Sequence, residues 1–411
     1  APGDLPVVAV DRYRTPNGWL LRPAGTQVQL LRAPTGLTVS PDARTVYVVN
    51  SSLSHEDLAV VDATTLAPTF APTTDLYMGV VADGSGNVWA AGGSRNRVWH
   101  YLATGPVAVG TRHVGVFPGT PNNGIPVAGY PGNMALDSVQ RRLFVAGNLS
   151  VVRNDCREGR ICSVVSVIDV GQPLDPATPR IRQVPVGRDA YGIALHPAGR
   201  YLFVSNWADE TRAPGATGTL SVLDVARPGS EREIRRLEVG HHPTGLAISP
   251  DGRVLAVTNS ADDTLSVVWL DPDTGEVVAG PVTVSVRTTP DAPKGATPLA
   301  VAFSPDSRLA FVGLAGQNAV EVLAVDADRH TLTPIPRRVD VGGHNGRQLD
   351  VAHTWIPTGW YPSAIATARH PSDPDRVRLY VTNLKGMGSG EGFMPRNSAQ
   401  PWHPTGATRE P

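Results

Sequence analysis

The chain has almost no net charge, no long apolar run and very few lysines. Its 411 residues hold 36 basic and 37 acidic side chains, which leaves no electrostatic footprint for nucleic acid or an anionic membrane surface. No apolar stretch approaches the roughly 18 residues that a membrane span needs. Lys294 and Lys385 are the only lysines, and the abundance of Ala, Pro, Gly and Arg fits the codon bias of a GC-rich bacterial genome. We therefore expect no nucleic-acid partner and no transmembrane segment.

Cysteine is nearly absent as well. Cys156 and Cys162 are the only two, and the short segment between them has turn character. A redox pair is disfavoured because the CxxC spacing is missing. We predict a disulfide that staples a hairpin, with two free thiols as the alternative. The chain starts at Ala1 in an Ala-Pro-Gly context that suits the mature side of a signal-peptide cut, although an engineered start would look the same. A secreted or periplasmic location is expected.

The common local signatures of catalysis are also missing. The sequence holds no serine nucleophile elbow, no phosphate-cradling glycine loop, no dinucleotide fingerprint and no HExxH or similar metal-ligand spacing. His241 and His242 are adjacent, but a structural or solvent role is favoured over a metal site. We predict no cofactor and no metal. Enzyme activity stays open, since a repeat architecture can assemble a site from residues far apart in sequence.

The sequence does contain a repeat. Its clearest unit runs from Pro243 through the turn Ser249-Pro250-Asp251-Gly252 to strand-like segments at 254–259 and 264–268. Equivalents of Gly245 recur at Gly36, Gly79, Asn133, Gly192, Ala300 and Ala364, 43 to 64 residues apart. That spacing is typical of four-stranded propeller blades. We predict an all-β, seven-bladed β-propeller, because a single blade cannot bury both its faces and radial stacking covers each sheet with the next.

The last repeat is incomplete. Two strands are expected between residues 364 and 383, but nothing after Asn383 resembles a third or fourth strand. Segment 18–31 resembles the missing outer half and leads directly into the first repeat. We predict a two-plus-two closure, in which the N-terminal segment completes the seventh blade and removes its open edge. The expected organisation is an extension at 1–17, the propeller at 18–383 and a tail at 384–411.

Strands of the form Tyr/Phe-Val-x-Asn, as at 47–50, 203–206 and 380–383, alternate with Ser-Pro-Asp-Gly turns. This pattern resembles the YVTN family of propellers over nearly the whole chain. Segments 17–25, 359–364, 379–383 and 385–389 are also similar to bacterial proteins in which such a propeller precedes a phosphoesterase domain of the alkaline-phosphatase superfamily. The resemblance implies a propeller associated with a phosphoesterase. This sequence contains no such phosphoesterase domain. We therefore assign the metal ligands and nucleophile of those enzymes to none of its residues.

Long loops on a rigid scaffold usually carry function, and we expect five of them on one face of the propeller. They are residues 105–130, 149–162, 207–217, 281–297 and 337–360. Side chains that should ring the channel mouth on that face combine arginine donors with aromatic surfaces, which suits an anionic or sugar-like ligand. They are Arg32, Asp75, Tyr130, Arg188, Asp189, His241, His242, Trp360 and Tyr361, joined from neighbouring loops by Arg95, Asn148, Trp207, Gln317 and Lys385. The alternative is that these groups only pair with one another and cap the backbone.

Two functions fit these features. The first is an exported scaffold that binds a small ligand or a protein partner through the long-loop face, alone or as the propeller part of a phosphoesterase. The second is a hydrolase in the channel mouth, as in lactonase-like propellers, with His242 or Asp189 as base and Arg32 or Arg188 steadying an oxyanion. The first is favoured because catalytic signatures are missing.

Overall fold

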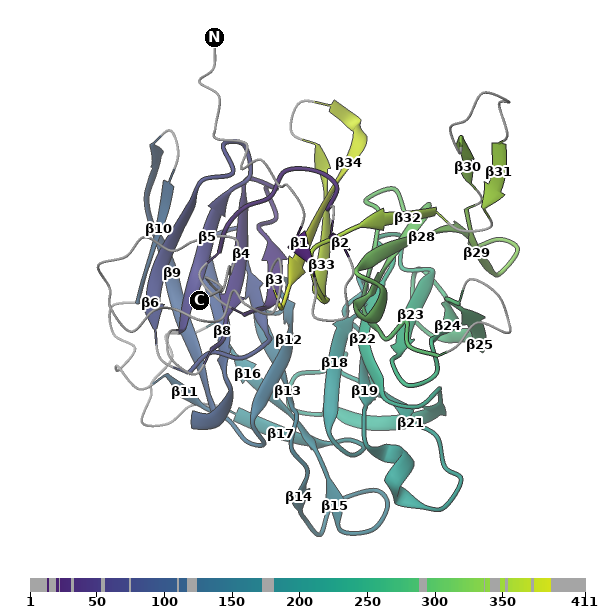
Figure 1. The fold of residues 1–411 in the computed structure, drawn as a ribbon. Helices are drawn as coiled ribbons and strands as arrows, with labels where there is room; N and C mark the ends of the chain where they lie inside the picture. Colours follow the sequence, from purple (N-terminus) through teal and green to yellow (C-terminus); the bar gives the residue numbers. More distant parts are fainter. Residues whose placement is uncertain are drawn as a thin grey trace, which may run out of the picture.

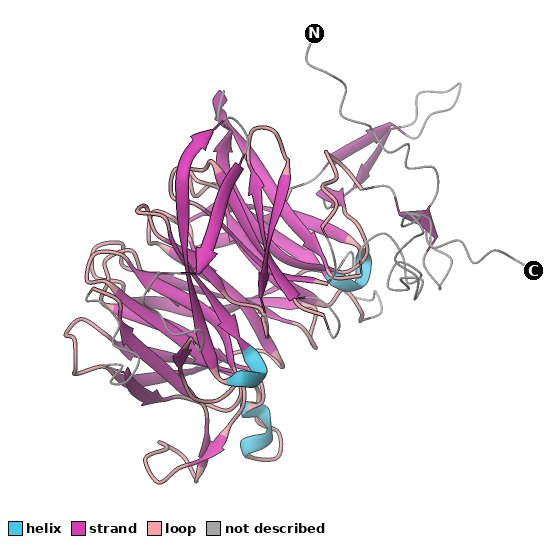
Figure 2. Ribbon diagram, turned by 90° about the vertical axis from the view of Figure 1, so that its left-hand side faces the viewer, coloured by secondary structure: helices cyan, strands magenta, loops and turns pink. Residues whose placement is uncertain are grey.

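Seven of the antiparallel sheets in the described part of the chain stand side by side, six with four main strands and the seventh with two (Figures 1 and 2). The computed structural model describes residues 13–14, 20–21, 23–30, 33–52, 56–73, 75–108, 111–116, 124–171, 181–287, 294–335, 337–340, 348–351, 354–370 and 373–385. Within these residues there is no α-helix, and the helical content is three short 3-10 turns. No helix in these ranges is long and apolar enough to cross a membrane.

Each of the first six sheets is a meander of four main strands. From the inner to the outer strand, the first blade consists of β3 (Pro34–Val39), β4 (Thr45–Asn50), β5 (Glu56–Asp62) and β6 (Pro68–Thr73). The second consists of β7 (Val80–Ala82), β8 (Asn87–Gly92), β9 (Arg97–Ala108) and β10 (Thr111–Val116), with β11 (Ile125–Pro126) paired to β9. The third consists of β12 (Pro131–Asp137), β13 (Arg142–Gly147), β16 (Val164–Asp169) and β17 (Ile181–Pro185).

The next three blades and the seventh sheet follow in order around the ring. The fourth blade consists of β18 (Ala190–Leu195), β19 (Tyr201–Asn206), β20 (Thr219–Asp224) and β21 (Arg232–Glu238), and the fifth of β22 (Pro243–Ile248), β23 (Val254–Asn259), β24 (Thr264–Leu270) and β25 (Val277–Ser285). The sixth consists of β26 (Pro298–Phe303), β27 (Leu309–Leu314), β28 (Ala319–Asp326) and β29 (Thr331–Pro334), with β32 (Thr354–Pro357) paired to β28. The seventh sheet consists of β33 (Pro362–His370) and β34 (Asp373–Asn383).

The inner strands form a closed ring. β33 of the seventh sheet packs against both β26 of the sixth and β3 of the first. The Ser363 hydroxyl donates to the Pro34 carbonyl over 2.8 Å and so joins residues 329 positions apart in the chain. An equivalent bond of 3.2 Å runs from the Thr35 hydroxyl to the Tyr77 carbonyl of the second blade. The closed ring agrees with the predicted seven-bladed propeller.

The hydrophobic core is divided among the interfaces between blades. Seven clusters of buried apolar side chains, taken with the partly buried ones packed against them, each draw on two neighbouring sheets. Second strands contribute strongly, because β4, β13, β19 and β23 are buried at every position. Their β-branched and aromatic residues suit a strand that is covered on both faces. Each blade is therefore stabilised by its neighbours rather than by a core of its own.

The N-terminal segment packs at the joint between the seventh and first blades. β1 (Tyr13–Arg14) pairs with β2 (Leu20–Leu21), so these residues form a ladder with each other rather than with β34. Residues 23–30 form no strand, but Val28 packs with Tyr380 of the seventh sheet against apolar side chains of the first blade. The segment thus covers the joint by side-chain packing. The predicted two-plus-two strand pairing is not confirmed.

Three predicted features fall on residues beyond the described ranges. They are most of the extension at 1–17, the tail from residue 386 onward and the candidate site residue Arg32.

The five predicted excursions do not all open on one face. The ladder of β9 with β8 ends at Leu102, whereas its ladder with β10 continues to Ala108, so the β9–β10 hairpin projects past β8 at the opposite face. The excursion between β29 and β32 leaves from the outer edge of the sixth blade, because both strands pair with β28. It carries the hairpin of β30 (Arg337–Asp340) and β31 (Gln348–Val351). The single-face prediction was wrong because spacing alone does not distinguish a loop from an insertion in an outer strand.

The predicted disulfide is present. Cys156 and Cys162 are bonded, with their Cα atoms 5.8 Å apart. The bond closes the hairpin of β14 (Val151–Val152) and β15 (Ile161–Cys162), which projects from the third blade at the bottom of Figure 1.

Candidate functional site

The residues that precede the inner strands share one backbone conformation. Tyr130, Asp189, His242 and Tyr361 have φ values of 58, 50, 49 and 66°, in the left-handed region that non-glycine residues rarely adopt. Each of their carbonyls accepts a hydrogen bond from the N–H that follows the second strand of the same blade, over 2.9 to 3.1 Å. This link holds the loop after the second strand over the inner strand. The predicted mouth residues therefore occupy equivalent positions, and such strained conformations are frequent at functional sites.

His242 is held by the loop of the preceding blade. Its Nε2 lies 2.8 Å from Glu210 Oε1, and its backbone N–H donates to the other carboxylate oxygen over 3.3 Å. The imidazole stacks on Trp207 with ring centroids 4.1 Å apart and planes 10° apart. The side chain remains 34% exposed. His242 is thus a solvent-accessible imidazole whose orientation is fixed by a carboxylate and an indole.

His241 has a different carboxylate partner. Asp262 accepts from the His241 N–H over 2.7 Å, and the same oxygen lies 2.9 Å from Nδ1. Lys294 Nζ lies 3.2 Å from the second Asp262 oxygen. Burial by itself would raise the pKa of Asp262, but the hydrogen bonds from His241 and Lys294 outweigh burial and hold the pKa below its usual value. The two adjacent histidines are therefore divided between two loops, and the described residues contain no group of three His, Cys, Asp or Glu side chains that could hold a metal.

Asp189 and Arg188 anchor the loops of the third and fourth blades. Asp189 Oδ1 accepts from the Ser150 N–H over 2.9 Å and from its hydroxyl over 2.7 Å. The Arg188 N–H donates to Asp209 over 2.8 Å, and its Nη1 donates to the carbonyl and hydroxyl of Thr211 over 3.0 and 3.1 Å. Both predicted residues thus make internal hydrogen bonds, which is the capping role that the sequence left open.

Tyrosine side chains gather near the starts of the inner strands. Tyr77 and Tyr130 meet edge to face, with centroids 5.0 Å apart. Burial raises the pKa of Tyr77, and the nearby Tyr130 raises it further. Burial also raises the pKa of Tyr191 on β18, reinforced by Tyr77 and Tyr361. Tyrosines from four blades therefore lie close enough to influence one another's ionisation.

Trp360 and Lys385 are two further predicted residues that lie close together. Lys385 Nζ lies 5.0 Å from the Trp360 ring centroid and 4.6 Å from that of Tyr361. This arrangement is a cation–π contact that covers the end of the seventh blade.

The sequence prediction missed the carboxylates that orient the histidines. Glu210 and Asp262 follow Asn206 and Asn259, the asparagines that end two equivalent second strands. Aligning the residues after these asparagines would have exposed acidic side chains at the start of successive loops. The 3-10 helix η2 (Asp209–Arg212) carries two acidic side chains with different partners, since Asp209 faces Arg188 and Glu210 faces His242.

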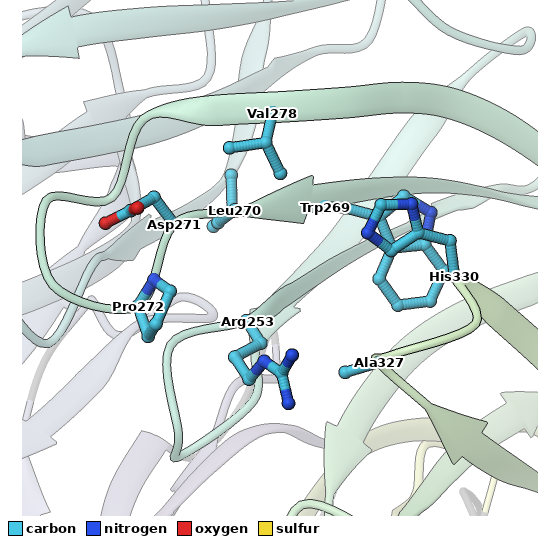
Figure 3. A pocket seen from close by; sticks show the side chains of 8 residues that line it. All are labelled: Arg253, Trp269, Leu270, Asp271, Pro272, Val278, Ala327 and His330. Atoms are coloured by element: carbon cyan, nitrogen blue, oxygen red, sulfur yellow. The ribbon is translucent and has the colours of Figure 1, made fainter.

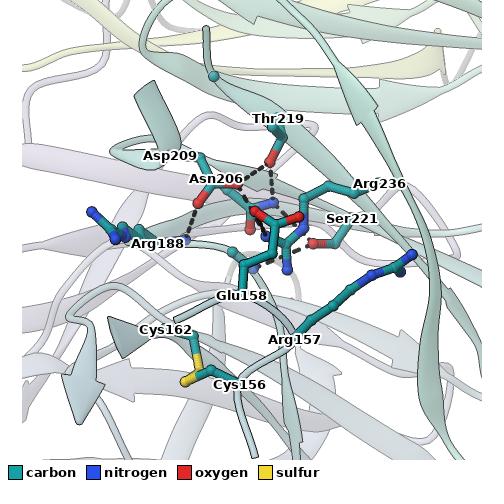
Figure 4. Close-up of polar contacts among 12 residues, drawn as sticks. Cys156, Arg157, Glu158, Cys162, Arg188, Asn206, Asp209, Thr219, Ser221 and Arg236 are labelled. Atoms are coloured by element: carbon teal, nitrogen blue, oxygen red, sulfur yellow. Dashed lines mark hydrogen bonds and ion pairs between the residues drawn. A yellow bond between two sulfur atoms is a disulfide. The ribbon is translucent and has the colours of Figure 1, made fainter. Parts of the chain in front are cut away.

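Two pockets stand out on opposite faces. A pocket of about 240 Å³ opens on the long-loop face between the third and fourth blades, and its lining includes the predicted residues Cys162 and Arg188. Figure 4 shows polar contacts among residues beside it. Another, of about 190 Å³, lies on the short-turn face between the fifth and sixth blades (Figure 3). Its wall includes Arg253 and the stacked rings of Trp269 and His330, 5.0 Å apart. None of the predicted residues lines this second pocket.

Comparison with known proteins supports the architecture. Residues 176–288 match the family "Lactonase, 7-bladed beta-propeller". The search of curated proteins finds no match. Hydrazine synthase of Kuenenia stuttgartiensis is similar in structure, with a TM-score of 0.57, 15% identity, and coverage of 88% of this chain and 99% of that chain.

Two further solved structures are similar over most of their length. The periplasmic gluconolactonase of Pseudomonas aeruginosa has a TM-score of 0.51 and 18% identity, with 83% of this chain and 92% of that chain covered. The β-propeller domain of Myceliophteria thermophila Cps50 (Swd1) has a TM-score of 0.52 and 12% identity, with 88% and 96% covered. At these identities the likeness concerns the fold. Together with the ring of seven sheets, it identifies the chain as a member of the β-propellers.

Proposed function

We propose that this chain is a hydrolase that opens a lactone or a related cyclic ester at the mouth of its channel, on the long-loop face. The observation that carries the proposal is the contact of His242 with Glu210 and Trp207, a partly exposed imidazole oriented by a carboxylate. That pairing is the usual arrangement of a general base in acyl transfer. The match of residues 176–288 to a lactonase family supports the same reaction class, and this segment contains His242.

The proposed mechanism gives each nitrogen of the imidazole a separate role. Glu210 Oε1 lies 2.8 Å from Nε2, so we propose the tautomer that carries its proton on Nε2 and leaves the lone pair on Nδ1, which has no hydrogen-bond partner within the described residues. Nδ1 would take a proton from water while the water oxygen bonds to the ester carbonyl carbon. Glu210 would stabilise the imidazolium, which then returns the proton to the alkoxide as the ring C–O bond breaks. Asp189 is the weaker candidate base because Ser150 already occupies its Oδ1.

An adjacent histidine provides a matched control. We expect His242→Gln to lower kcat/KM for hydrolysis of gluconolactone at least about 100-fold, because a general base contributes at least that factor. His241→Gln should retain activity within about threefold, although His241 is also exposed and bonded to a carboxylate. Lactone hydrolysis is followed by pH-stat titration, after correction for spontaneous opening. Equal activity in the two variants, or no turnover by the parent chain, would refute the proposal.

A binding scaffold is the second candidate. The disulfide-closed hairpin exposes Leu149, Val152 and Ile161 at 55, 70 and 45% on the long-loop face, as a protein-docking surface would. The phosphoesterase implied by the sequence resemblance is the partner class we propose for it, and the disulfide favours an oxidising, extracytoplasmic compartment. A chain that turns over no lactone but binds a purified phosphoesterase domain would favour the scaffold over the hydrolase.

A further inference from the structure

Two side-chain partners of His242 belong to one loop of the fourth blade, residues 207–210, which we call the Trp207 loop. Trp207 stacks on the imidazole, and Glu210 Oε1 lies 2.8 Å from Nε2. A displacement of this loop therefore moves the indole and the carboxylate together relative to the imidazole. The orientation of His242 thus depends on the contacts that hold the Trp207 loop in place.

The Trp207 loop is held on the two residues that precede β18. The Trp207 N–H donates to the Asp189 carbonyl over 3.0 Å, and the Ala208 N–H donates to the Arg188 carbonyl over 3.2 Å. The Arg188 N–H in turn donates to the Asp209 carboxylate over 2.8 Å. These hydrogen bonds fix the loop to the start of the inner strand.

Asp189 is itself held by Ser150, at the base of the disulfide-closed hairpin. The Ser150 hydroxyl accepts from the Asp189 N–H over 2.9 Å and donates to Oδ1 over 2.7 Å, and the Ser150 N–H donates to the same oxygen over 2.9 Å. Asp189 has a φ of 50°, in the left-handed region that is unfavourable for a non-glycine residue. The bonds from this one serine oppose that strain and keep the Asp189 carbonyl in place to accept from Trp207.

Ser163, at the other end of the hairpin, holds the same segment. Its buried hydroxyl accepts from the Ala190 N–H over 3.2 Å, and its N–H donates to the Gly187 carbonyl over 2.9 Å. The ladder of β14 with β15 has two residue pairs, and a hairpin of that size is marginally stable by itself. The bond between Cys156 and Cys162 therefore keeps the hairpin closed.

From these contacts we propose that the disulfide-closed hairpin positions His242, with Ser150 as a positioning residue that acts through Asp189 and Trp207. Loss of the Ser150 hydroxyl would let Asp189 relax from its left-handed conformation and shift the Trp207 loop against the imidazole. The consequence for catalysis rests on the proposed hydrolase function, whereas the effect on the orientation of the imidazole does not. Spectroscopy and kinetics therefore test the two separately.

The second blade offers a matched control. Asp75 also has a left-handed conformation, with a φ of 66°, and its carboxylate accepts from the Ser94 N–H over 3.0 Å and from the Ser94 hydroxyl. Its carbonyl accepts from the Trp99 indole N–H over 3.1 Å. Ser94→Ala therefore removes a serine–aspartate contact of the same kind, in a blade that carries neither Trp207 nor Glu210.

NMR of the full chain tests the position of the imidazole. The ring current of Trp207 shifts the His242 Cε1–H signal, which is assigned by its loss in His242→Gln, and Trp207→Leu gives the unstacked position. The shift is read at both ends of a pH titration, so that protonation is not mistaken for stacking. We expect Ser150→Ala to move the signal toward the unstacked position, and Ser94→Ala and Ser150→Thr to leave it unchanged. A Ser150→Ala signal at the parent position would overturn the proposal, whether or not the chain hydrolyses lactones.

Kinetics test the consequence for the reaction. In a chain that turns over gluconolactone, Ser150→Ala should lower kcat about tenfold and change KM less than about twofold, because a small displacement of a catalytic group slows the chemical step. Adding Ser150→Ala to Trp207→Leu should lower kcat no further, since both changes act through one contact. Losses that multiply in the double variant would contradict this coupling. Absence of turnover by the parent chain would refute the hydrolase and leave the NMR test intact.

Reduction of the disulfide tests the role of hairpin closure. A phosphine reductant that opens the bond between Cys156 and Cys162 should move the His242 signal in the same direction as Ser150→Ala, and reoxidation should restore it. A signal that stays in place after both thiols are shown to be free would overturn the role of the disulfide in the proposal.

Discussion

The two faces of the propeller hold their polar groups in different ways. On the short-turn face the Ser249 hydroxyl donates to Asp251 over 2.6 Å and accepts from the Val254 N–H over 2.9 Å. The same arrangement recurs at Ser40 and Ser304. These bonds span at most five residues, so this part of each turn lies within one hairpin. Turns of neighbouring blades are also linked, because the Asp251 N–H donates to the Ser307 hydroxyl over 3.0 Å and the Gly252 carbonyl lies 2.9 Å from His196 Nε2.

Carboxylates on the long-loop face accept from distant residues. Asp189 binds Ser150, 39 residues away, and Asp263 binds the N–H of Gly295, 32 residues away, over 2.6 Å. Both bonds join loops of consecutive blades. The comparison teaches that each short turn has a local set of bonds that can form within its own hairpin, whereas these loop contacts form only when neighbouring blades have stacked.

Arg142 is the strongest challenge to this comparison, because it joins two blades on the short-turn face. Its guanidinium lies 3.0 Å from Asp137 and 3.0 Å from Glu231, and all three side chains are at most 4% exposed. Arg142→Met should lower the free energy of unfolding by about 3 to 5 kcal/mol, because two buried carboxylates lose their buried counterion. Urea unfolding followed by tryptophan fluorescence measures the loss. An unchanged midpoint would mean that the Arg142 bridge contributes nothing to the stability of the two blades it joins.

His100 makes the short-turn face sensitive to pH. Its Nε2 lies 3.0 Å from Asn87 Oδ1, and its ring stacks on Trp89 with centroids 4.9 Å apart. Burial lowers the pKa of His100 to about 4, although Asp83 opposes the shift. His100 of the unfolded chain therefore binds a proton below about pH 6.5, whereas His100 of the folded chain stays neutral down to about pH 4. The free energy of unfolding consequently falls as the pH drops from about 6.5 to about 4.

The expected size of this effect is up to about 3 kcal/mol between pH 6.5 and 4. His100→Gln should remove that component, so its free energy of unfolding should change less over the same window than that of the parent chain. Denaturant titrations at half-unit pH steps measure the two slopes. Parallel slopes would show that His100 is not the group responsible.

A pair of aspartates tests the comparison most directly. Asp263→Ala should lower the free energy of unfolding by about 2 kcal/mol, because the N–H groups of Gly295 and Thr297 lose a buried acceptor. Asp306→Ala should cost about 0.5 kcal/mol, since this exposed carboxylate serves one turn around Ser304. Asp263→Asn is the control for backbone conformation, because Asn tolerates the φ of 55° at this position. Similar losses for the two alanine variants would erase the distinction between the faces.

Local repeats explain why the fold was predictable. The asparagine that ends a Tyr/Phe-Val-x-Asn strand bonds within its own blade, as Asn206 Nδ2 does with the hydroxyls of Thr219 and Ser221 at 2.9 Å. A side chain whose hydrogen bonds lie within one repeat recurs at regular intervals in the sequence. The spacing of such residues therefore predicted the strands and the number of blades.

Contacts between loops left a weaker trace. Glu210 and His242 are 32 positions apart and lie in consecutive blades, so no local pattern connects them. The N-terminal segment was predicted from its strand-like composition, but Val28 contributes packing rather than a ladder. Composition predicts apolar character well, whereas the choice between side-chain packing and backbone pairing depends on the edge that the segment meets.

The bond from Ser363 to Pro34 also bears on how the chain folds. Because it joins residues 329 positions apart, it forms only after nearly the whole chain is available. Each doubling of the number of residues in such a loop adds only about 0.6 kcal/mol to the entropic free energy of closing it. Closing the ring therefore reduces the stability of the protein only slightly. Contacts of this separation are nevertheless slow to form. The rate of folding is therefore expected to depend on the meeting of the first and seventh sheets rather than on the formation of individual blades.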